Sequence, residues 1–380
     1  WWETVRRCIV GAQEIGANYT QSEAEKLFYY MWNLKGLFGG RMLWQLGTET
    51  VKRFGANSLL NCLSGDTKVL TRQGWKEISS LENTKQTIVT KNGKWVDAEF
   101  KSYGEQHLYE VEFRSKQGHT QKVRATAKHR WFILDKNNNH TEVTTDQLLH
   151  EHRVPVVRGK NSSKKLSPQG IQHGLVFGDG SCNGYESHID LIGDTLHYCK
   201  KYFAINDYTI INGEDYHVRF TGMPNYYKTL PDINENKQYL SGFLAGWIAA
   251  DGSVNKASKQ MRLFNKSKEV LERAKDIASV LGYRTSEPYL ERDYNPFDVE
   301  DETSELWSIM FYRSDNPHRL LIRKDHLEKY GDLDEKEYDN WMKVTNVRPT
   351  GIKETVYCAE VPETHSFVIN GNILTGNCWF

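Results

Sequence analysis

Residues that can rearrange a peptide bond stand at two distant points of the chain. Cys62 follows Asn61, and Asn377 is followed by Cys378. A cysteine thiolate can attack the carbonyl of the preceding residue and turn the amide into a thioester, which a second thiol can then accept. An asparagine can break the chain by attacking its own carbonyl carbon with its side-chain nitrogen. The pattern predicts that residues 62–377 are excised and that Asn61 is joined to Cys378.

Two further motifs accompany these junctions. Residues 126–129 read Thr-Ala-Lys-His, and residues 356–369 carry Cys358 and His365 ahead of the terminal asparagine. A histidine can act as a general acid or base on a reacting group. Taken singly, each histidine is better explained as a hydrogen-bonded structural imidazole. The order of all the motifs along the chain favours the chemical interpretation.

The motifs together resemble the splicing blocks of the intein family over the whole span 62–377. The resemblance implies a β-rich, horseshoe-shaped Hint domain that cuts itself out without a cofactor. It also implies one role for each matching position: Cys62 as first nucleophile, Thr126 as an aid to positioning, His129 as the group that activates the Asn61–Cys62 amide, His365 as proton donor or orienter, Asn377 as the cyclising residue and Cys378 as second nucleophile.

Two positions depart from the family pattern. Gly376 stands where most members have histidine before the terminal asparagine, so one proton-transfer group is missing. We therefore expect His365 to carry more of the Asn377 step and C-terminal cleavage to be slow. Cys358 stands where many members have aspartate, and a thiol there could either tune a neighbouring thiol in catalysis or be a buried apolar side chain.

Between the junctions, two apolar segments each end in Asp-Gly-Ser. Residues 174–181 contain Asp179, and residues 244–253 contain Asp251. Both segments read as helices whose small residues permit close approach, and the glycine after each aspartate predicts a left-handed cap. The two carboxylates are then expected beside each other between two half-domains, where they repel unless a cation lies between them.

These segments resemble the paired helices of LAGLIDADG homing endonucleases. The second matches closely and the first more loosely, because Phe177-Gly178 replaces the usual small pair. The resemblance implies that Asp179 and Asp251 bind Mg²⁺ and direct cleavage of double-stranded DNA at an intein-free copy of the host gene. The structural alternative is a pair of ordinary buried helices.

A basic run follows the second segment, and a solvated face and a phosphate-contacting face explain it about equally well. It consists of Lys256, Lys259, Arg262, Lys266 and Lys268.

The residues on either side of 62–377 also contain a recognisable sequence pattern. Residues 40–48, and a junction that would read Asn61-Cys378-Trp379-Phe380 after excision, resemble the monomeric adenosylcobalamin-dependent ribonucleotide reductases. The resemblance covers only 1–61 and 378–380. It implies that Cys378 serves again in the ligated enzyme, as one of the cysteines that reduce the ribose of a nucleotide substrate. Most of the cobalamin site would lie outside this chain.

The elements that must position these residues follow from apolar periodicity and turn signals. Residues 1–61 are expected to be a mainly helical host flank. Short β runs and turns such as Asn92-Gly93 predict an all-β unit at 62–160. Similar strand patterns return at 341–377. Residues 158–170 read as a polar linker into an α+β insert at 165–338. The expected fold is therefore multidomain: an all-β Hint horseshoe interrupted by an α+β endonuclease.

The composition limits which classes of function and partner are possible. The formal net charge is zero, so a DNA-binding surface must come from local segregation of charge. The six cysteines form no C-x-x-C pair, which argues against a zinc site or a disulfide framework and favours a reducing cytoplasm. No apolar run approaches membrane-spanning length, so no membrane partner is expected. The chain starts with Trp1 rather than Met and is expected to be a fragment of a longer product.

Two rival interpretations belong to other functional classes. One is a reductase with a structural insertion that never splices, in which the junction residues could change without consequence. The other is a decayed intein kept only as a DNA-binding nuclease. The joint presence of Cys62, Asn377 and Cys378 argues against both, because decay would be free to remove any of them.

Overall fold

The computed structural model describes residues 1–14, 17–36, 46–47, 62–116, 118–134, 139–160, 165–213, 215–293, 305–331, 340–361 and 364–377. The N-terminal part contains α1 (Trp2–Glu14) and α2 (Gln21–Trp32), which share a small apolar core. Thr20 and Glu23 form a capping box that explains where α2 begins. No helix in the described ranges is long and apolar enough to cross a membrane. No disulfide joins two of the five cysteines within those ranges.

The predicted β unit is a 12-stranded antiparallel sheet assembled from both sides of the insert. Because β19 pairs with β20 on one side and with β2 on the other, the sheet closes on itself. Its strands are β1 (Leu63–Ser64), β2 (Lys68–Thr71), β3 (Gly74–Glu77), β4 (Lys85–Val89), β5 (Trp95–Arg114), β6 (Thr120–Thr126), β7 (Arg130–Leu134), β8 (His140–Thr144), β9 (Arg153–Pro155), β18 (Trp341–Glu360), β19 (Ser366–Ile369) and β20 (Ile373–Gly376).

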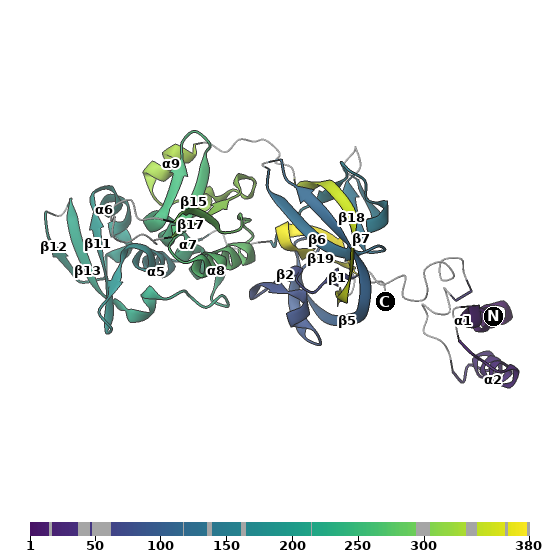
Figure 1. Cartoon of the computed structure of the whole chain (residues 1–380). Coiled ribbons are helices and arrows are strands. Elements are labelled where there is room, and N and C mark those ends of the chain that lie inside the picture. The colour runs from purple at the N-terminus through teal and green to yellow at the C-terminus, as the bar shows by residue number, and fades with distance from the viewer. Residues whose placement is uncertain are drawn as a thin grey trace.

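The long strand β18 ties the two parts of this sheet together. It runs antiparallel to β5 along most of its length and also pairs with β1 and β9. In Figure 1 the yellow C-terminal strands lie among the blue strands from the first part of the sheet. The sheet contains two clusters of buried apolar side chains, and the insert has a cluster of its own, so the burial of apolar surface can stabilise each unit separately.

The insert is built from two copies of one arrangement. Each copy is a helix, a hairpin, a second helix and another hairpin, and each sheet has four strands in the same spatial order, first-second-fourth-third. The first copy comprises α5 (Pro168–Asp179), β10 (Ser181–Cys182), β11 (Glu186–Ile192), α6 (Gly193–Cys199), β12 (Tyr208–Ile210) and β13 (His217–Pro224). The second comprises α7 (Lys237–Asp251), β14 (Gly252–Asn255), β15 (Gln260–Asn265), α8 (Lys268–Val280), β16 (Tyr289–Arg292) and β17 (Leu306–Phe311), and is followed by α9 (Lys324–Tyr330).

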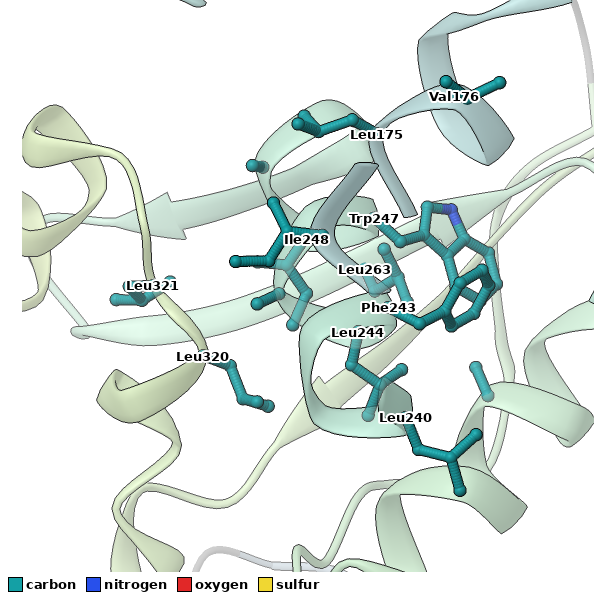
Figure 2. Close-up of a cluster of buried hydrophobic side chains, with 14 of the residues drawn as sticks. Leu175, Val176, Leu240, Phe243, Leu244, Trp247, Ile248, Leu263, Leu320 and Leu321 are labelled. Atoms are coloured by element: carbon teal, nitrogen blue, oxygen red, sulfur yellow. The ribbon is translucent and has the colours of Figure 1, made fainter. Parts of the chain in front are cut away.

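Helices α5 and α7 form the seam between the two copies. A Cβ on Gly174 would lie 2.0 Å from the Phe243 carbonyl oxygen, and one on Gly246 would lie 2.1 Å from the Ile171 carbonyl oxygen. The glycines are therefore required by backbone-to-backbone contact. Larger side chains of α7, including Phe243 and Trp247, fill the space around the seam (Figure 2).

Two sequence predictions were wrong in detail at this seam. Residues 168–170 belong to α5 and not to the linker, because Pro168 opens the helix and Ser167 caps it. The glycines after the two aspartates are extended (φ −85° at Gly180 and −88° at Gly252), not left-handed. The chain passes straight from each helix into a strand there, and glycine is needed because a Cβ would meet the carbonyl of the preceding helical turn.

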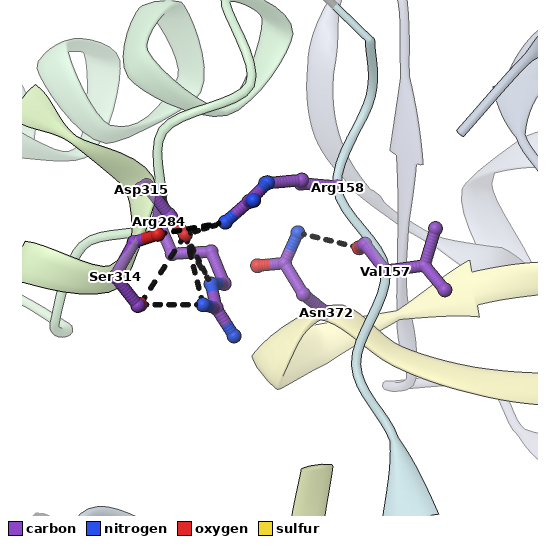
Figure 3. Close-up of polar contacts among 6 residues, drawn as sticks. All are labelled: Val157, Arg158, Arg284, Ser314, Asp315 and Asn372. Carbon is purple, nitrogen blue, oxygen red and sulfur yellow. Dashed lines mark hydrogen bonds and ion pairs between the residues drawn. The ribbon is translucent and has the colours of Figure 1, made fainter. Parts of the chain in front are cut away.

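Direct contacts join the insert to the closed sheet. The Trp75 backbone N–H donates to Asp276 Oδ1 (2.9 Å), and its indole Nε1 donates to Ser279 Oγ (2.9 Å). On the other side, the buried carboxylate of Asp315 is shared by Arg284 of the insert and Arg158 of the connecting segment (Figure 3). A buried carboxylate needs such partners, and these fix the insert against the sheet.

Replacing Gly246 with leucine is expected to destabilise the insert by about 3 kcal/mol, because the new side chain must push α5 away from α7. Gln169→Leu, at an exposed position of α5, is the matched control and should change stability little. Chemical unfolding of both variants measures the difference. Equal stability of Gly246→Leu and the parent would contradict the close contact.

Candidate functional site

The position of Cys62 is set by the strand that follows it. Cys62 is fully buried, and β1 pairs with β6 on one side and β18 on the other. The backbone N–H of Cys62, the nitrogen of the predicted scissile bond, donates to Thr126 Oγ1 (3.3 Å), and the Thr126 N–H donates to the Cys62 carbonyl (3.0 Å). Thr126 therefore touches the first junction directly. Asn61, on the other side of that bond, lies outside the described residues.

His129 lies one turn after Thr126 and links the first junction to the last strand. Its backbone N–H donates to the Thr126 carbonyl (3.0 Å), and its imidazole is fully buried. The ring packs edge-on against Trp131 with centroids 4.9 Å apart, and Nε2 is hydrogen-bonded to the hydroxyl of Thr375. Thr375 belongs to β20 and stands two residues before Asn377, so the imidazole lies between the two predicted junction regions.

The C-terminal junction is buried as well. Asn377 is 1% exposed; its backbone N–H donates to the His365 carbonyl (3.1 Å) and its Nδ2 donates to the Val361 carbonyl (3.4 Å). His365 has a left-handed backbone (φ 46°), which is uncommon for a non-glycine residue and turns the chain into β19. Through its carbonyl it contacts the backbone of the predicted cyclising residue. Cys378 lies outside the described residues.

Cys358 is placed beside the first junction by strand register. Leu63 pairs with Tyr357, so the same antiparallel register puts Cys358 opposite Cys62, and both thiols lie in one buried cluster. The Cys358 thiol also approaches its neighbour's carbonyl, that of Ala359 (3.5 Å). The neighbouring-thiol interpretation of Cys358 thus has the required adjacency, although burial suits the apolar interpretation equally.

Sequence reasoning missed two residues of this site. Thr375 holds the imidazole of His129, and the guanidinium of Arg130 donates to the His365 carbonyl (3.0 Å). Arg130 directly follows the histidine motif and is only 8% exposed, which is rare for an arginine. The apolar surroundings of position 130 in β7 were the available signal.

In the insert, the structure brings the two predicted aspartates to one place. A Cβ on Gly178 would lie 3.1 Å from Asp251 Oδ2, so the end of α5 that carries Asp179 touches Asp251. Burial, with a further contribution from the charge on Asp179, raises the pKa of Asp251 to about 6, although the indole N–H of Trp247 donates to this carboxylate (2.9 Å). Burial raises the pKa of Asp179 too.

Two cations that the sequence did not single out stand at the ends of these helices. Lys228 Nζ donates to the last carbonyls of α5, including that of Phe177 (2.6 Å), and Arg323 donates to the Ala249 carbonyl of α7 (3.0 Å). Lys228 follows β13 and Arg323 follows β17, so each cation comes after the last strand of its own copy. Their charges oppose the rise in the pKa of Asp179. Burial lowers the pKa of Lys228.

The pair of aspartates suits a hard divalent cation only as part of a larger oxygen set. Within the described ranges, no group of three or more His, Cys, Asp or Glu side chains forms a metal cluster. Mg²⁺ is often held by just one or two carboxylates, with water and substrate phosphates completing its octahedron. Two adjacent, partly desolvated carboxylates with oxygen-only donors fit that pattern.

The members of the basic run differ in their surroundings. Arg262 pairs with Glu291 (2.8 Å), and the Lys268 ammonium lies over the Trp307 ring, 5.4 Å from its centroid. Lys256, which is exposed, and Lys259, which is half-buried, lie in the turn between β14 and β15. Two members of the run, Arg262 and Lys268, therefore have partners within the insert itself.

Known proteins offer two kinds of similarity. Among solved structures, a variant of the Ssp DnaB mini-intein is 9% identical, with 84% of this chain and 95% of that chain covered and a TM-score of 0.29. The I-DmoI structures in complex with DNA are 18% identical: the one with Mn covers 42% of this chain and 100% of its own (TM-score 0.30), and the one with Ca covers 40% and 86% (TM-score 0.28). No curated protein matches the sequence.

The match to a family model establishes the family of this chain. The model of the intein splicing domain matches residues 64–377, from β1 to the buried Asn377. The match spans the closed sheet, the insert and the segment that carries His365, and it stops at the asparagine that the chemistry predicts as the last excised residue. This chain belongs to the intein splicing domain family.

Proposed function

We propose that this chain excises residues 62–377 and joins Asn61 to Cys378. The observation that carries the proposal is the hydrogen bond between His129 and Thr375, which holds the histidine motif beside the first junction against the strand that ends at the last one. Excision requires the two junctions to meet, because an acyl group must pass from one to the other. A structural insertion would not need buried polar side chains there.

The first step occurs at Cys62. Its sulfur attacks the Asn61 carbonyl carbon, a C–S bond forms, the C–N bond breaks and the amide nitrogen gains a proton. Thr126 accepts a hydrogen bond from that same nitrogen and so holds the peptide in place. His129 polarises the amide and supplies the proton, as a positioned imidazole acting as general acid can.

The second and third steps complete the transfer. The Cys378 thiol takes the acyl group from Cys62, with release of the Cys62 thiol. Asn377 Nδ2 then attacks its own carbonyl carbon, the bond to Cys378 breaks, and the proton from Nδ2 passes to the released amine. The freed amine attacks the thioester and restores a peptide bond between Asn61 and Cys378. His365, whose carbonyl holds the Asn377 N–H, orients this asparagine.

For the insert we propose site-specific cleavage of double-stranded DNA. The contact between the ends of α5 and α7, which puts Asp179 and Asp251 side by side at the seam of a repeated fold, supports it. Bound there, Mg²⁺ would activate water and stabilise the leaving oxygen of a phosphodiester. Asp179 and Asp251 would hold it, and Lys228 and Arg323 place positive charge nearby for the phosphates. The target is the host gene without its insertion.

The ligated flanks are proposed to form part of a ribonucleotide reductase that uses adenosylcobalamin. The sequence around Asn61-Cys378-Trp379-Phe380 supports this, and the splicing proposal does not depend on it.

Expression of the chain with a tag on each flank, under reducing conditions, should yield two products by intact mass spectrometry. One is the excised 62–377 segment and the other is the ligated flanks. Cys62→Ala should abolish both, whereas Cys182→Ala, at an exposed thiol of the insert, should change neither. A stable full-length precursor would refute self-excision.

His129→Ala should suppress thiol-induced cleavage at the first junction by on the order of a hundredfold or more, because the amide loses its proton donor. The measurement uses an Asn377→Ala background, in which added dithiothreitol releases the N-terminal flank. His150→Ala, at an exposed imidazole, is the matched control. Unchanged cleavage in His129→Ala would remove His129 from the mechanism.

DNA cleavage should depend on pH through Asp251. The ionised carboxylate binds the cation, and its raised pKa means that protons compete as pH falls through about 6 rather than about 4. We expect the Mg²⁺ requirement for cleavage of a plasmid carrying the joined host site to increase steeply between pH ~7.5 and pH ~5.5. Asp251→Asn should abolish cleavage and leave the insert folded. Cleavage by this variant at the parent rate would exclude a metal role for Asp251.

A further inference from the structure

The glycine before the terminal asparagine is required by space and not by backbone conformation. Gly376 lies in the extended strand β20, opposite Ser366, where any residue is tolerated. A Cβ there would lie 2.8 Å from Arg130 Nε, 2.9 Å from Arg130 Cβ and 3.0 Å from its Nη2. The side chain of Arg130 therefore fills the volume that a side chain at position 376 would occupy.

Arg130 is also connected to the asparagine. Its Nη2 donates to the His365 carbonyl (3.0 Å), and this same oxygen accepts the backbone N–H of Asn377 (3.1 Å). Two donors thus converge on the carbonyl of a residue held in a left-handed conformation, which is strained for a non-glycine residue and persists only where surrounding contacts enforce it. Arg130 is one of those contacts.

We propose that Arg130 occupies the space of a side chain at position 376 and acts as the positioning residue for cyclisation of Asn377. This rests on the proposed splicing function and adds a residue to its last cleavage step. In that step the Nδ2–C bond forms, the bond to residue 378 breaks, and the Nδ2 proton passes to the released amine. Arg130 takes no proton; it fixes the His365 carbonyl and thereby the Asn377 backbone, so that Nδ2 can reach its own carbonyl carbon.

Arginine has properties that suit this position. Its planar guanidinium stays charged and can serve partners in several directions in one plane, which lysine cannot. Besides His365, the guanidinium lies 3.5 Å from the exposed carboxylate of Glu142 on β8, so the charge is partly balanced from the surface. The Arg130 carbonyl accepts from Thr375 Oγ1 (3.2 Å), which ties it to the strand that precedes Asn377.

The test separates the two junctions. C-terminal cleavage is timed in a Cys62→Ala background, where only Asn377 cyclisation releases the C-terminal tag. N-terminal cleavage by dithiothreitol is timed in an Asn377→Ala background. Arg130→Ala should slow the first by about ten- to a hundredfold and leave the second within about twofold. Arg130→Lys should fall between Arg130→Ala and the parent, and Glu142→Gln is the control that should leave both rates near the parent's.

A swap tests the shared volume directly. Gly376→His alone should slow C-terminal cleavage, because its side chain collides with Arg130. In the Arg130→Ala background the same histidine has room, and it should restore C-terminal cleavage to within about tenfold of the parent.

The outcomes distinguish this inference from the splicing proposal. An unchanged C-terminal rate in Arg130→Ala overturns the role of Arg130, and an equal loss at both junctions does so too, because it would show a general structural effect. Selective loss without rescue by the swapped histidine overturns the claim that Arg130 occupies the space of that side chain. Failure of the Cys62→Ala parent to cleave at Asn377 would count against the proposed function itself.

Discussion

Strand β1 is only two residues long, yet it is hydrogen-bonded on both sides, to β6 and to β18. This double pairing fixes Cys62 in the interior and determines which residues surround it. From β6 comes Thr126, at the strand end where the histidine turn starts, and from β18 comes Cys358. Because β18 lies beyond the insert, the first junction is complete only after the C-terminal part of the chain has joined the sheet.

Another pairing of β18, with β9, explains how a large insert is tolerated. Strand β9, just before the insert, pairs with the first residues of β18, just after it, with Pro155 opposite Trp341. The insert therefore leaves and re-enters the sheet at neighbouring points, and its two ends need no special bridge. Contacts of Trp75 with Asp276, and of Arg158 with Asp315, then hold the insert against the sheet. Both units keep separate apolar cores, so neither has to distort the other.

Within the insert, close approach of α5 and α7 has an electrostatic consequence. Glycines that let the backbones touch also bring the ends of both helices together, and with them Asp179 and Asp251. The carbonyl ends of two helices and two carboxylates concentrate negative potential at one point. Lys228 and Arg323, which donate hydrogen bonds to carbonyls at the ends of α5 and α7, offset part of this potential. The remaining negative potential lies at the seam between the two copies, where burial and also the charge on Asp179 raise the pKa of Asp251.

The sequence by itself determined which residue types could do chemistry, and most of the local structure. The cysteines and asparagine at the junctions, the Asp-Gly-Ser endings and strands such as β2 or β7 are readable because their signals are local: reactive groups, alternating apolar residues and turn residues. Only the tertiary structure decided which of these meet. The contact between His129 and Thr375, the placement of Cys358 opposite Cys62 and the use of the space at Gly376 by Arg130 join residues far apart in the chain. The extended glycines after the two aspartates were likewise set by the strands they enter, because tertiary pairing overrides a local capping preference.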